Sequence, residues 1–226
     1  MNTKKRVLLS WSSGKDSIWA LRVLRQRTDV VIEGLFTTIN EQSNRVAMHG
    51  VRTELVKEQA KKLQLPIEII PLPFPCSNED YERITGSYFE AFRSKGITTI
   101  AFGDLFLGDV RAYREKQLEG TGLEAMFPIW GQETGTLARQ MIHEGTKAII
   151  TCADSKQIPE AYSGQLFDEH FIDSLPPEVD RCGEQGEFHT FVYDTPLFTS
   201  PISIQTGEQV ERDGFVFTDV KVAPTL

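Results

Sequence analysis

The sequence predicts an α/β fold built around a parallel sheet, and three features support this prediction. Short apolar runs alternate with segments of helical periodicity from residue 6 to residue 102, which is typical of βαβ units with right-handed crossovers. A loop of small residues joins the first strand to the first helix. After Pro176-Pro177 the pattern changes to closely spaced strands, which indicates a second, smaller α+β domain.

Each element of the first half is predicted from its own pattern. Short apolar runs predict strands at residues 6–10, 30–38, 67–72 and 97–102. Apolar residues at helical spacing predict helices at residues 16–26, 52–64 and 78–95. Ser77 or Asn78 is the expected N-cap of the third helix, and Gly96 suits its C-terminal cap. The polar residues 40–50 are expected to form a loop.

The second half has fewer helical segments. A helix at residues 136–144 is expected between strands at 123–129 and 148–152. Further strands are expected at residues 188–194, 202–205, 210–212 and 215–222. Asp213-Gly214 predicts a tight turn before the last of these strands. We therefore expect two domains, one at residues 1–125 and one at residues 126–226.

Composition and charge narrow the classes of function. The formal net charge of −8 argues against a broad surface for nucleic acid, which would be rich in Lys and Arg. The three cysteines are far apart and form no C-x-x-C pair. No apolar run approaches the length of a membrane span, and the run after Lys4-Lys5-Arg6 stops at Ser10, too early for a signal peptide. A cytoplasmic protein is expected.

The loop after the first strand has the chemistry of a phosphate site. Ser10 ends the strand, and the loop itself reads Ser12-Ser13-Gly14-Lys15-Asp16-Ser17. A turn of small residues that leads into a helix presents backbone N–H groups and a favourable dipole to phosphate. Lys15 is a candidate for neutralising phosphate charge. Asp16 is a candidate for orienting the loop or holding Mg²⁺.

The loop resembles the S-G-G-x-D-S motif of the PP-loop ATP pyrophosphatases, whose fold is Rossmann-like (adenine nucleotide alpha hydrolase-like). It differs at Ser13, where that family usually has Gly. The wider pattern, from about residue 6 to 200, is similar to bacterial-type members of the diphthine–ammonia ligase family. It includes Met48-His49-Gly50, Gly103-Asp104, Arg111-Ala-Tyr-Arg114-Glu115, Phe127-Pro-Ile-Trp130-Gly131 and Cys182-Gly-Glu184-Gln-Gly186-Glu187-Phe188-His189-Thr190-Phe191.

This resemblance implies an ATP-dependent ligase. A substrate carboxylate would attack the α-phosphate of ATP, pyrophosphate would leave, and ammonia would displace AMP to give an amide. Adenylation converts a poor leaving group into a good one. The resemblance also places Thr37, Thr38 and His49 near adenine. The implied cofactors are ATP and Mg²⁺, and the implied partners are ammonium and a carboxylate substrate.

Further candidate residues follow two predicted strands. Gly103 and Asp104 lie at the carboxyl end of a strand, where ligands bind in open α/β sheets; Asp104 is a candidate ligand of Mg²⁺ or the ribose. Arg111 and Arg114 are candidates for binding phosphate or the substrate carboxylate.

A short acidic segment supplies the second group of candidates. Glu184, Glu187 and His189 are expected to bind an amine or take protons from ammonia. The expected catalytic residues are therefore Lys15, Asp16, Glu187 and His189.

Other functions of related folds stay open at this point. Thiolation or lysidine formation on tRNA would favour paired cysteines or a basic surface, and neither is present. A non-catalytic ATP-binding regulatory module would not need the segment from Glu184 to His189. The carboxylate is also open, between diphthine on elongation factor 2 and a small metabolite, as in cobalamin salvage. The sequence does not decide whether the chain forms a homo-oligomer.

Overall fold

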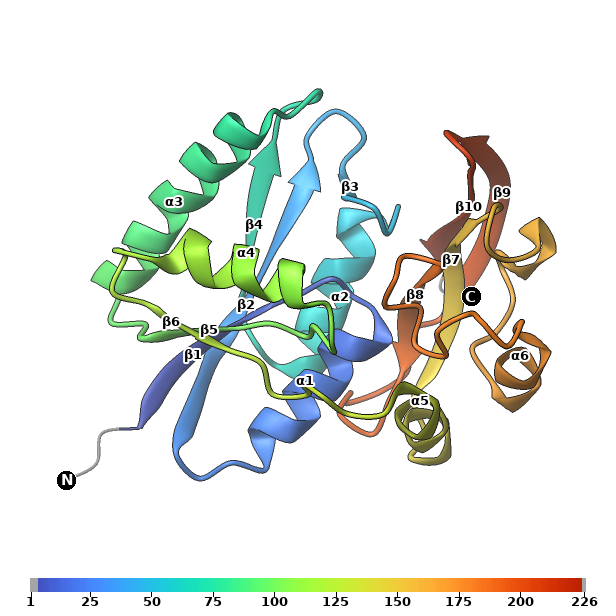
Figure 1. Cartoon of the computed structure of the whole chain (residues 1–226), viewed down its shortest axis with the longest axis horizontal. Coiled ribbons are helices and arrows are strands. Elements are labelled where there is room, and N and C mark those ends of the chain that lie inside the picture. Colours follow the sequence, from blue (N-terminus) through green and yellow to red (C-terminus); the bar gives the residue numbers. More distant parts are fainter. Residues whose placement is uncertain (1–3, 225–226) are drawn as a thin grey trace.

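The computed structural model describes residues 4–224 and contains two sheets. Sheet A is formed by the first half of the chain and sheet B by the second, and the two lie side by side (Figure 1). The predicted α/β class, with a largely parallel Rossmann-like sheet and a smaller C-terminal α+β part, is confirmed.

Sheet A is parallel except at one edge. Its path is β3-β2-β1-β5-β6, and β4 pairs with β2 off this path. All of its pairs are parallel except that between β2 and β3. Its strands are β1 (Lys5–Ser10), β2 (Val30–Asn40), β3 (Arg45–Val46), β4 (Ile67–Leu72), β5 (Thr99–Ala101) and β6 (Glu124–Met126).

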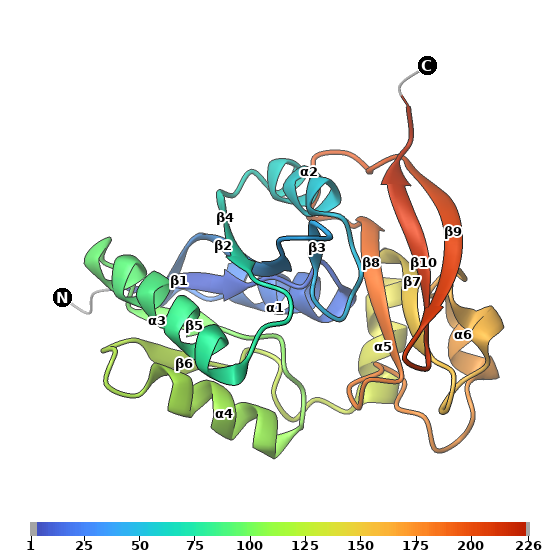
Figure 2. The same cartoon turned by 90° about the horizontal axis from the view of Figure 1, so that it is seen from above.

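Helices cover both faces of sheet A because strands buried on both sides need apolar cover. Helices α1 (Lys15–Arg25) and α2 (Thr53–Leu63) lie on the face toward sheet B. Helices α3 (Asn78–Ser94) and α4 (Gly108–Leu118) lie on the other face, as Figure 2 shows. Phe89 and Phe92 of α3 pack there with Phe36 of β2.

Sheet B is antiparallel, in the order β8-β7-β10-β9. A short 3₁₀ turn, Glu160–Tyr162, follows β7. The elements of this half are α5 (Thr134–His143), β7 (Lys147–Asp154), α6 (Glu169–Ser174), β8 (Phe188–Asp194), β9 (Ile204–Arg212) and β10 (Phe215–Val222).

One apolar core joins the two halves. It runs from β1 through α1 and α2 to sheet B and α6, and it includes Leu9, Leu21, Leu55, Phe171 and Phe191. Each of these side chains is at most 1% exposed. The halves are therefore packed against each other, and the cleft described below lies where they meet.

Three sequence predictions of elements need correction, and two helices were missed. The strand expected at residues 123–129 belongs to sheet A as β6, because it pairs with β5. The loop expected at residues 40–50 contains the short strand β3. Residues 202–205 and 210–212 are parts of one strand, β9. Helices α4 and α6 were not predicted from their own sequence patterns.

The helices of residues 4–224 include none that is both long and apolar enough to cross a bilayer. The predicted division at residue 125 stays a prediction.

Candidate functional site

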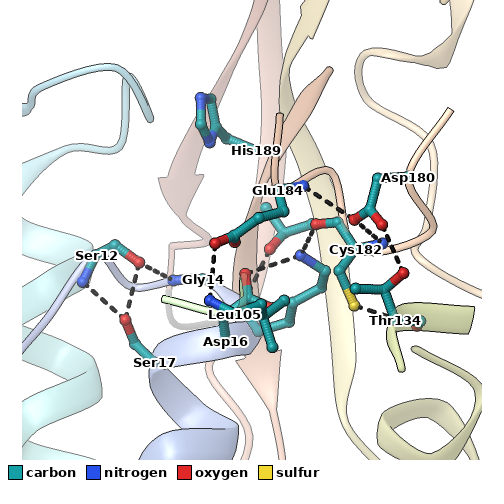
Figure 3. Close-up of polar contacts among 12 residues, drawn as sticks. Ser12, Gly14, Asp16, Ser17, Leu105, Thr134, Asp180, Cys182, Glu184 and His189 are labelled. Atoms are coloured by element: carbon teal, nitrogen blue, oxygen red, sulfur yellow. Dashed lines mark hydrogen bonds and ion pairs between the residues drawn. The ribbon is translucent and has the colours of Figure 1, made fainter. Parts of the chain in front are cut away.

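The loop between β1 and α1 is folded around its own serines. Ser12 donates its backbone N–H to the Ser17 hydroxyl at 3.1 Å, and the two hydroxyls lie 2.9 Å apart (Figure 3). The N–H of Gly14 points to the Ser12 hydroxyl at 3.3 Å. Gly14 is the N-cap of α1 and contributes no side-chain cap. The loop therefore presents hydroxyls and helix N–H groups at one place, as a phosphate site requires.

Ser13 is the strained residue of this loop. Its φ is 73°, in the left-handed region that favours glycine. The residue is fully buried, and its hydroxyl has no hydrogen-bond partner among the described residues. The difference from the family motif at this position therefore carries a conformational cost.

Strand β8 supports the loop from the second half. Thr190 accepts a hydrogen bond from the Lys15 backbone N–H through its Oγ1 at 3.1 Å. Val192 donates its backbone N–H to the Ser13 carbonyl at 3.1 Å. A Cβ on Gly14 would lie 3.2 Å from the Thr190 carbonyl oxygen, so this close approach favours glycine.

Lys15 directs its side chain toward the second half. The side chain is 2% exposed; its ammonium group pairs with Asp16 at 2.9 Å and donates to the Cys182 carbonyl. It also lies over the rings of Phe167 and Phe188, at 5.6 and 5.3 Å from their centroids. Burial alone would lower the Lys15 pKa, but the attraction of Asp16 and other acidic groups outweighs it and raises the pKa. Lys15 therefore carries its positive charge beside the cleft.

A cleft opens where β1, β2 and β5 end, and it has two lobes. The first lobe contains Ser12, Lys15, Asp16, Asp104, Glu184 and Thr190 among its lining residues. The second lobe contains Phe36, Thr37, Thr38, Met48, Phe89 and Gln117. Both lobes are lined by Ser10, Ser12, His49, Phe102, Val110, Arg114 and His189. Most of the predicted site residues are thus brought to one cleft.

Three carboxylates lie around the first lobe. Asp16 and Asp104 each have one buried oxygen without a hydrogen-bond partner among the described residues. Burial raises the pKa of Asp16 even though the positive charge of Lys15 lowers it. Burial also raises the pKa of Asp104, and here the positive charge of Arg114 acts in the lowering direction. Glu184 accepts the Leu105 N–H at 2.7 Å, and burial raises the pKa of Glu184 to about 7 (Figure 3). The lobe therefore suits a cation or a proton.

Two histidines stand between the lobes. The rings of His49 and His189 are 4.4 Å apart, centroid to centroid. Burial lowers the pKa of His189 to about 4, and burial together with the charges of His189 and Lys15 keeps the pKa of His49 well below its usual value. Both rings are therefore neutral near pH 7 and available as hydrogen-bond acceptors.

The two predicted arginines of α4 are used differently. Arg114 lines both lobes and faces Asp104 at 3.7 Å. Arg111 pairs with Glu115 at 2.8 Å and lies over the rings of Phe127 and Trp130, each at 4.9 Å. Arg114 is thus placed at the cleft, whereas Arg111 lies outside its lining.

Glu187 lies outside the lining of both lobes. It is 1% exposed and accepts the Asp180 N–H at 2.9 Å. Asp180 in turn accepts the N–H groups of Cys182 and Glu184, at 2.9 and 3.1 Å (Figure 3). Glu187 therefore supports the turn that carries Glu184, and the catalytic role expected for it stays a prediction.

Gly103 packs tightly behind the loop. A Cβ there would lie 3.2 Å from the backbone of Asp16. The residue lines the first lobe, as its position at the end of a strand predicted.

Sequence reasoning did not single out Thr190 or Gln59. Thr190 lies within the acidic segment but has no charge to mark it. The sequence does mark Gln59 as a buried polar residue, because it lies four residues from both Leu55 and Leu63 on the apolar face of a predicted helix. A polar residue at such a position needs hydrogen-bond partners in the core.

Within residues 4–224, no cluster of three or more His, Cys, Asp or Glu side chains is arranged to hold a metal ion by itself. A Mg²⁺ ion commonly uses one or two carboxylates and completes its coordination with phosphates and water. The unpartnered oxygens of Asp16 and Asp104 fit that smaller requirement.

Comparison with known families gives two matches that together span most of the chain. A model described as "Diphthamide synthase N-terminal domain" matches residues 5–125. A model described as "Diphthamide synthase C-terminal domain" matches residues 133–224.

Curated relatives share the name diphthine–ammonia ligase. The protein of Homo sapiens is 30% identical over 150 residues, which cover 64% of this chain and 56% of the relative. That of Bos taurus is 24% identical over 155 residues, covering 66% of this chain and 58% of the relative. That of Rattus norvegicus is 27% identical over 150 residues, covering 64% and 56%. The aligned region thus spans less than two thirds of these relatives' length.

Proposed function

The chain belongs to the diphthamide synthase family, and we propose that it is an ATP-dependent amide ligase. In this proposal the enzyme adenylates a substrate carboxylate, releases pyrophosphate and forms the amide with ammonia. The observation that carries it is the two-lobed cleft with the Ser12–Ser17 loop at its floor. The names of the curated relatives support a ligase that uses ammonia.

The lobes suit different parts of the nucleotide. The first lobe offers the loop hydroxyls and the N-terminus of α1 to phosphates. The second lobe combines the aromatic rings of Phe36 and Phe89 with the hydroxyls of Thr37 and Thr38, which suits adenine and ribose. His49 lies between the two and would face the nucleotide from the side.

The first step needs charge to be stabilised on the leaving pyrophosphate. Arg114 lines the cleft and supplies one positive charge. Lys15 supplies a second, and reaching phosphate requires its ammonium group to turn from Cys182 toward the lobe that it lines. Asp16 and Asp104 are the proposed ligands of Mg²⁺, which would neutralise phosphate charge when bound.

The second step needs a proton acceptor for ammonia. Glu184 has a pKa of about 7, which suits proton transfer near neutral pH. His189 is neutral and lines the same lobe. We assign ammonia binding and proton uptake to these two side chains, with Glu187 holding the turn in place.

Product analysis tests the proposal. The protein is incubated with ATP, Mg²⁺, ammonium and a carboxylate, with diphthine-bearing protein in one arm and small-metabolite carboxylates in the other. We expect carboxylate-dependent AMP and pyrophosphate. Substrate-dependent ADP and phosphate would contradict cleavage at the α-phosphate.

Two matched glutamate variants test the assignment within the acidic segment. Glu184→Gln should lower turnover at least tenfold with ATP binding retained, because Glu184 lines the lobe. Glu187→Gln should mainly lower thermal stability, because its carboxylate lies behind the turn. Equal turnover in Glu184→Gln and the wild type would refute the role of Glu184.

A further inference from the structure

Gln59 is a buried polar side chain with no part in the lining of the cleft. It lies on α2, is 0% exposed and makes hydrogen bonds to two other segments of the chain, the stretch after β1 and strand β8. Its Oε1 accepts the indole N–H of Trp11 at 2.8 Å. Its Nε2 donates to the carbonyl oxygens of Ser13 at 3.0 Å and Val192 at 2.7 Å.

The orientation of this amide follows from its partners. The Trp11 indole can only donate, and the two backbone carbonyls can only accept. The oxygen of Gln59 must therefore face Trp11, and the nitrogen must face Ser13 and Val192. A reversed amide would oppose like groups at all three contacts, so the side chain is locked.

This arrangement fixes one peptide unit of the nucleotide loop. The Ser13 carbonyl receives two hydrogen bonds, from Gln59 and from the Val192 N–H. In a trans peptide the carbonyl and the following N–H point in opposite directions, and the bond before Gly14 is trans. Holding the Ser13 carbonyl in the core therefore turns the Gly14 N–H to the opposite side, toward the hydroxyl of Ser12. Ser12 is a lining residue of the cleft, whereas Gly14 itself is not.

We propose that Gln59 is a positioning residue that aims the Gly14 N–H at a phosphate group, acting from behind the loop. It also holds Ser13 at its φ of 73°. This role rests on the proposed nucleotide site. It predicts a larger effect on ligands that carry phosphates, because Gln59 holds the loop directly at the Ser13 carbonyl. Its link to the second lobe, where adenosine would lie, runs through the indole N–H of Trp11, which lines that lobe.

The test compares ATP with adenosine in Gln59→Met, a variant of similar volume that lacks the amide. Affinities are measured by displacement of a fluorescent nucleotide, and thermal unfolding is followed in parallel. We expect ATP affinity to fall about tenfold relative to adenosine affinity, the equivalent of about 1.4 kcal/mol. The control is Thr218→Val, which removes buried hydrogen bonds to Ser163 and Gln209 away from the loop. Thr218→Val should leave the ratio of ATP affinity to adenosine affinity unchanged.

A double variant separates positioning from stability. Ser13→Gly removes the strained side chain and should restore part of the stability lost in Gln59→Met. Glycine does not restore the anchor on the carbonyl, so the ratio of ATP to adenosine affinity should stay low. If Gln59→Met alone does not fold, the two affinities can still be measured in the more stable double variant.

Two results would overturn the role of Gln59. The first is a ratio of ATP affinity to adenosine affinity in Gln59→Met that equals that of the wild type. The second is a double variant in which both this ratio and the stability return toward the wild type. A wild-type protein that binds no ATP would instead refute the proposed function, and with it this role.

Discussion

Ser13 has a backbone conformation that is unfavourable for a residue with a side chain. The left-handed conformation costs a residue with a Cβ about 1–2 kcal/mol, and the buried hydroxyl finds no partner among the described residues. The loop keeps this conformation because the Ser13 carbonyl is anchored on both Gln59 and Val192. The sequence indicated the mismatch through the missing glycine, and the structure supplies the anchors that tolerate it.

Replacing Ser13 should therefore stabilise the protein. We expect Ser13→Gly to raise the free energy of unfolding by about 1 kcal/mol, the relief of strain less the extra entropy of glycine in the unfolded chain. Urea unfolding measures this change. Ser13→Ala is the matched control, because it removes the hydroxyl but keeps the Cβ. If Ser13→Ala gained as much unfolding free energy as Ser13→Gly, the buried hydroxyl, and not the backbone conformation, would be what destabilises the wild type.

Glu184 should make stability depend on pH. Its pKa is about 7 in the folded protein against an ordinary value of 4.5, because burial outweighs the hydrogen bond from Leu105. Between these values the folded state keeps a proton that the unfolded state has lost. Its contribution to stability is therefore full below pH 4.5 and is lost as pH rises toward 7.

Glu184→Gln should remove this dependence. We expect the stability of the variant relative to the wild type to rise from pH 4.5 to 7 and then level off. Urea unfolding at a series of pH values measures it. Glu133→Gln should change in the opposite direction and in a lower window, because hydrogen bonds from Thr136 and Gly135 lower the Glu133 pKa. Its stability relative to the wild type should fall as pH rises to 4.5 and then stay level. A flat difference for Glu184→Gln would contradict the raised pKa.

At the scale of elements, α1 obtains its N-terminal cap from another part of the chain. Gly14 supplies no side chain, and Thr190 of β8 accepts the Lys15 N–H instead. The nucleotide loop is therefore shaped partly by a residue more than 170 positions away in the sequence. This contact links the acidic segment to the loop.

Thr190→Val should show the value of this cap. We expect a loss of about 1 kcal/mol in unfolding free energy, the usual effect of removing an N-cap side chain. Thr151→Val is the control, because the Thr151 hydroxyl makes only a long hydrogen bond of 3.4 Å to the His189 carbonyl. Equal losses in the two variants would mean that the cap adds nothing specific.

Local patterns predicted many of the elements but not every one. The span of β10 was predicted with its observed limits and that of α2 to within one residue at each end, because periodicity and the breakers around them are local signals. Helix α4 was not predicted from its own pattern, since Leu118 is its one fully buried residue and it has no apolar stripe. The assignment of β6 to sheet A depended on pairing with β5, which a local pattern does not contain.

The candidate site was predictable where motifs mark it. Asp104, Glu184 and His189 were named from the sequence and line the first lobe, and so do four residues of the loop: Ser12, Lys15, Asp16 and Ser17. Ser13 and Gly14 of the same loop do not line it. The roles of Glu187 and Arg111 could not be separated from those of their neighbours, because side-chain direction depends on the turn or helix that carries them.

At the scale of the whole molecule, the two halves share their core and a charged contact. Asp219 of β10 accepts hydrogen bonds from Arg45 at 2.7 Å and from Arg52 at 2.9 Å, and its side chain is 15% exposed. Burial alone would raise the pKa of Asp219, but the two arginines outweigh it and hold the pKa well below its usual range. The last hairpin is thereby tied to the first half beside α2.

Breaking this contact should weaken the molecule as a unit. We expect Asp219→Asn to cost about 2 kcal/mol, because it leaves two partly buried arginines without their carboxylate. Asp29→Asn, at an exposed pair with Arg27, should cost less than about 1 kcal/mol. The loss in Asp219→Asn should disappear as pH falls below 3.8, where the unfolded carboxyl protonates and the wild type loses the same stability.

Because the apolar core continues from sheet A through α1 to sheet B, the variant should still unfold in one transition. Tryptophan fluorescence reports on the first half through the buried Trp11 and Trp19 and through Trp130, which packs against Arg111 of α4. Far-ultraviolet circular dichroism reports on both sheets. In the wild type and in Asp219→Asn alike, the urea curve followed by fluorescence is expected to coincide with the curve followed by dichroism. An earlier dichroism transition in the variant would show that sheet B detaches first, and that the contact at Asp219, rather than the shared core, holds the halves together.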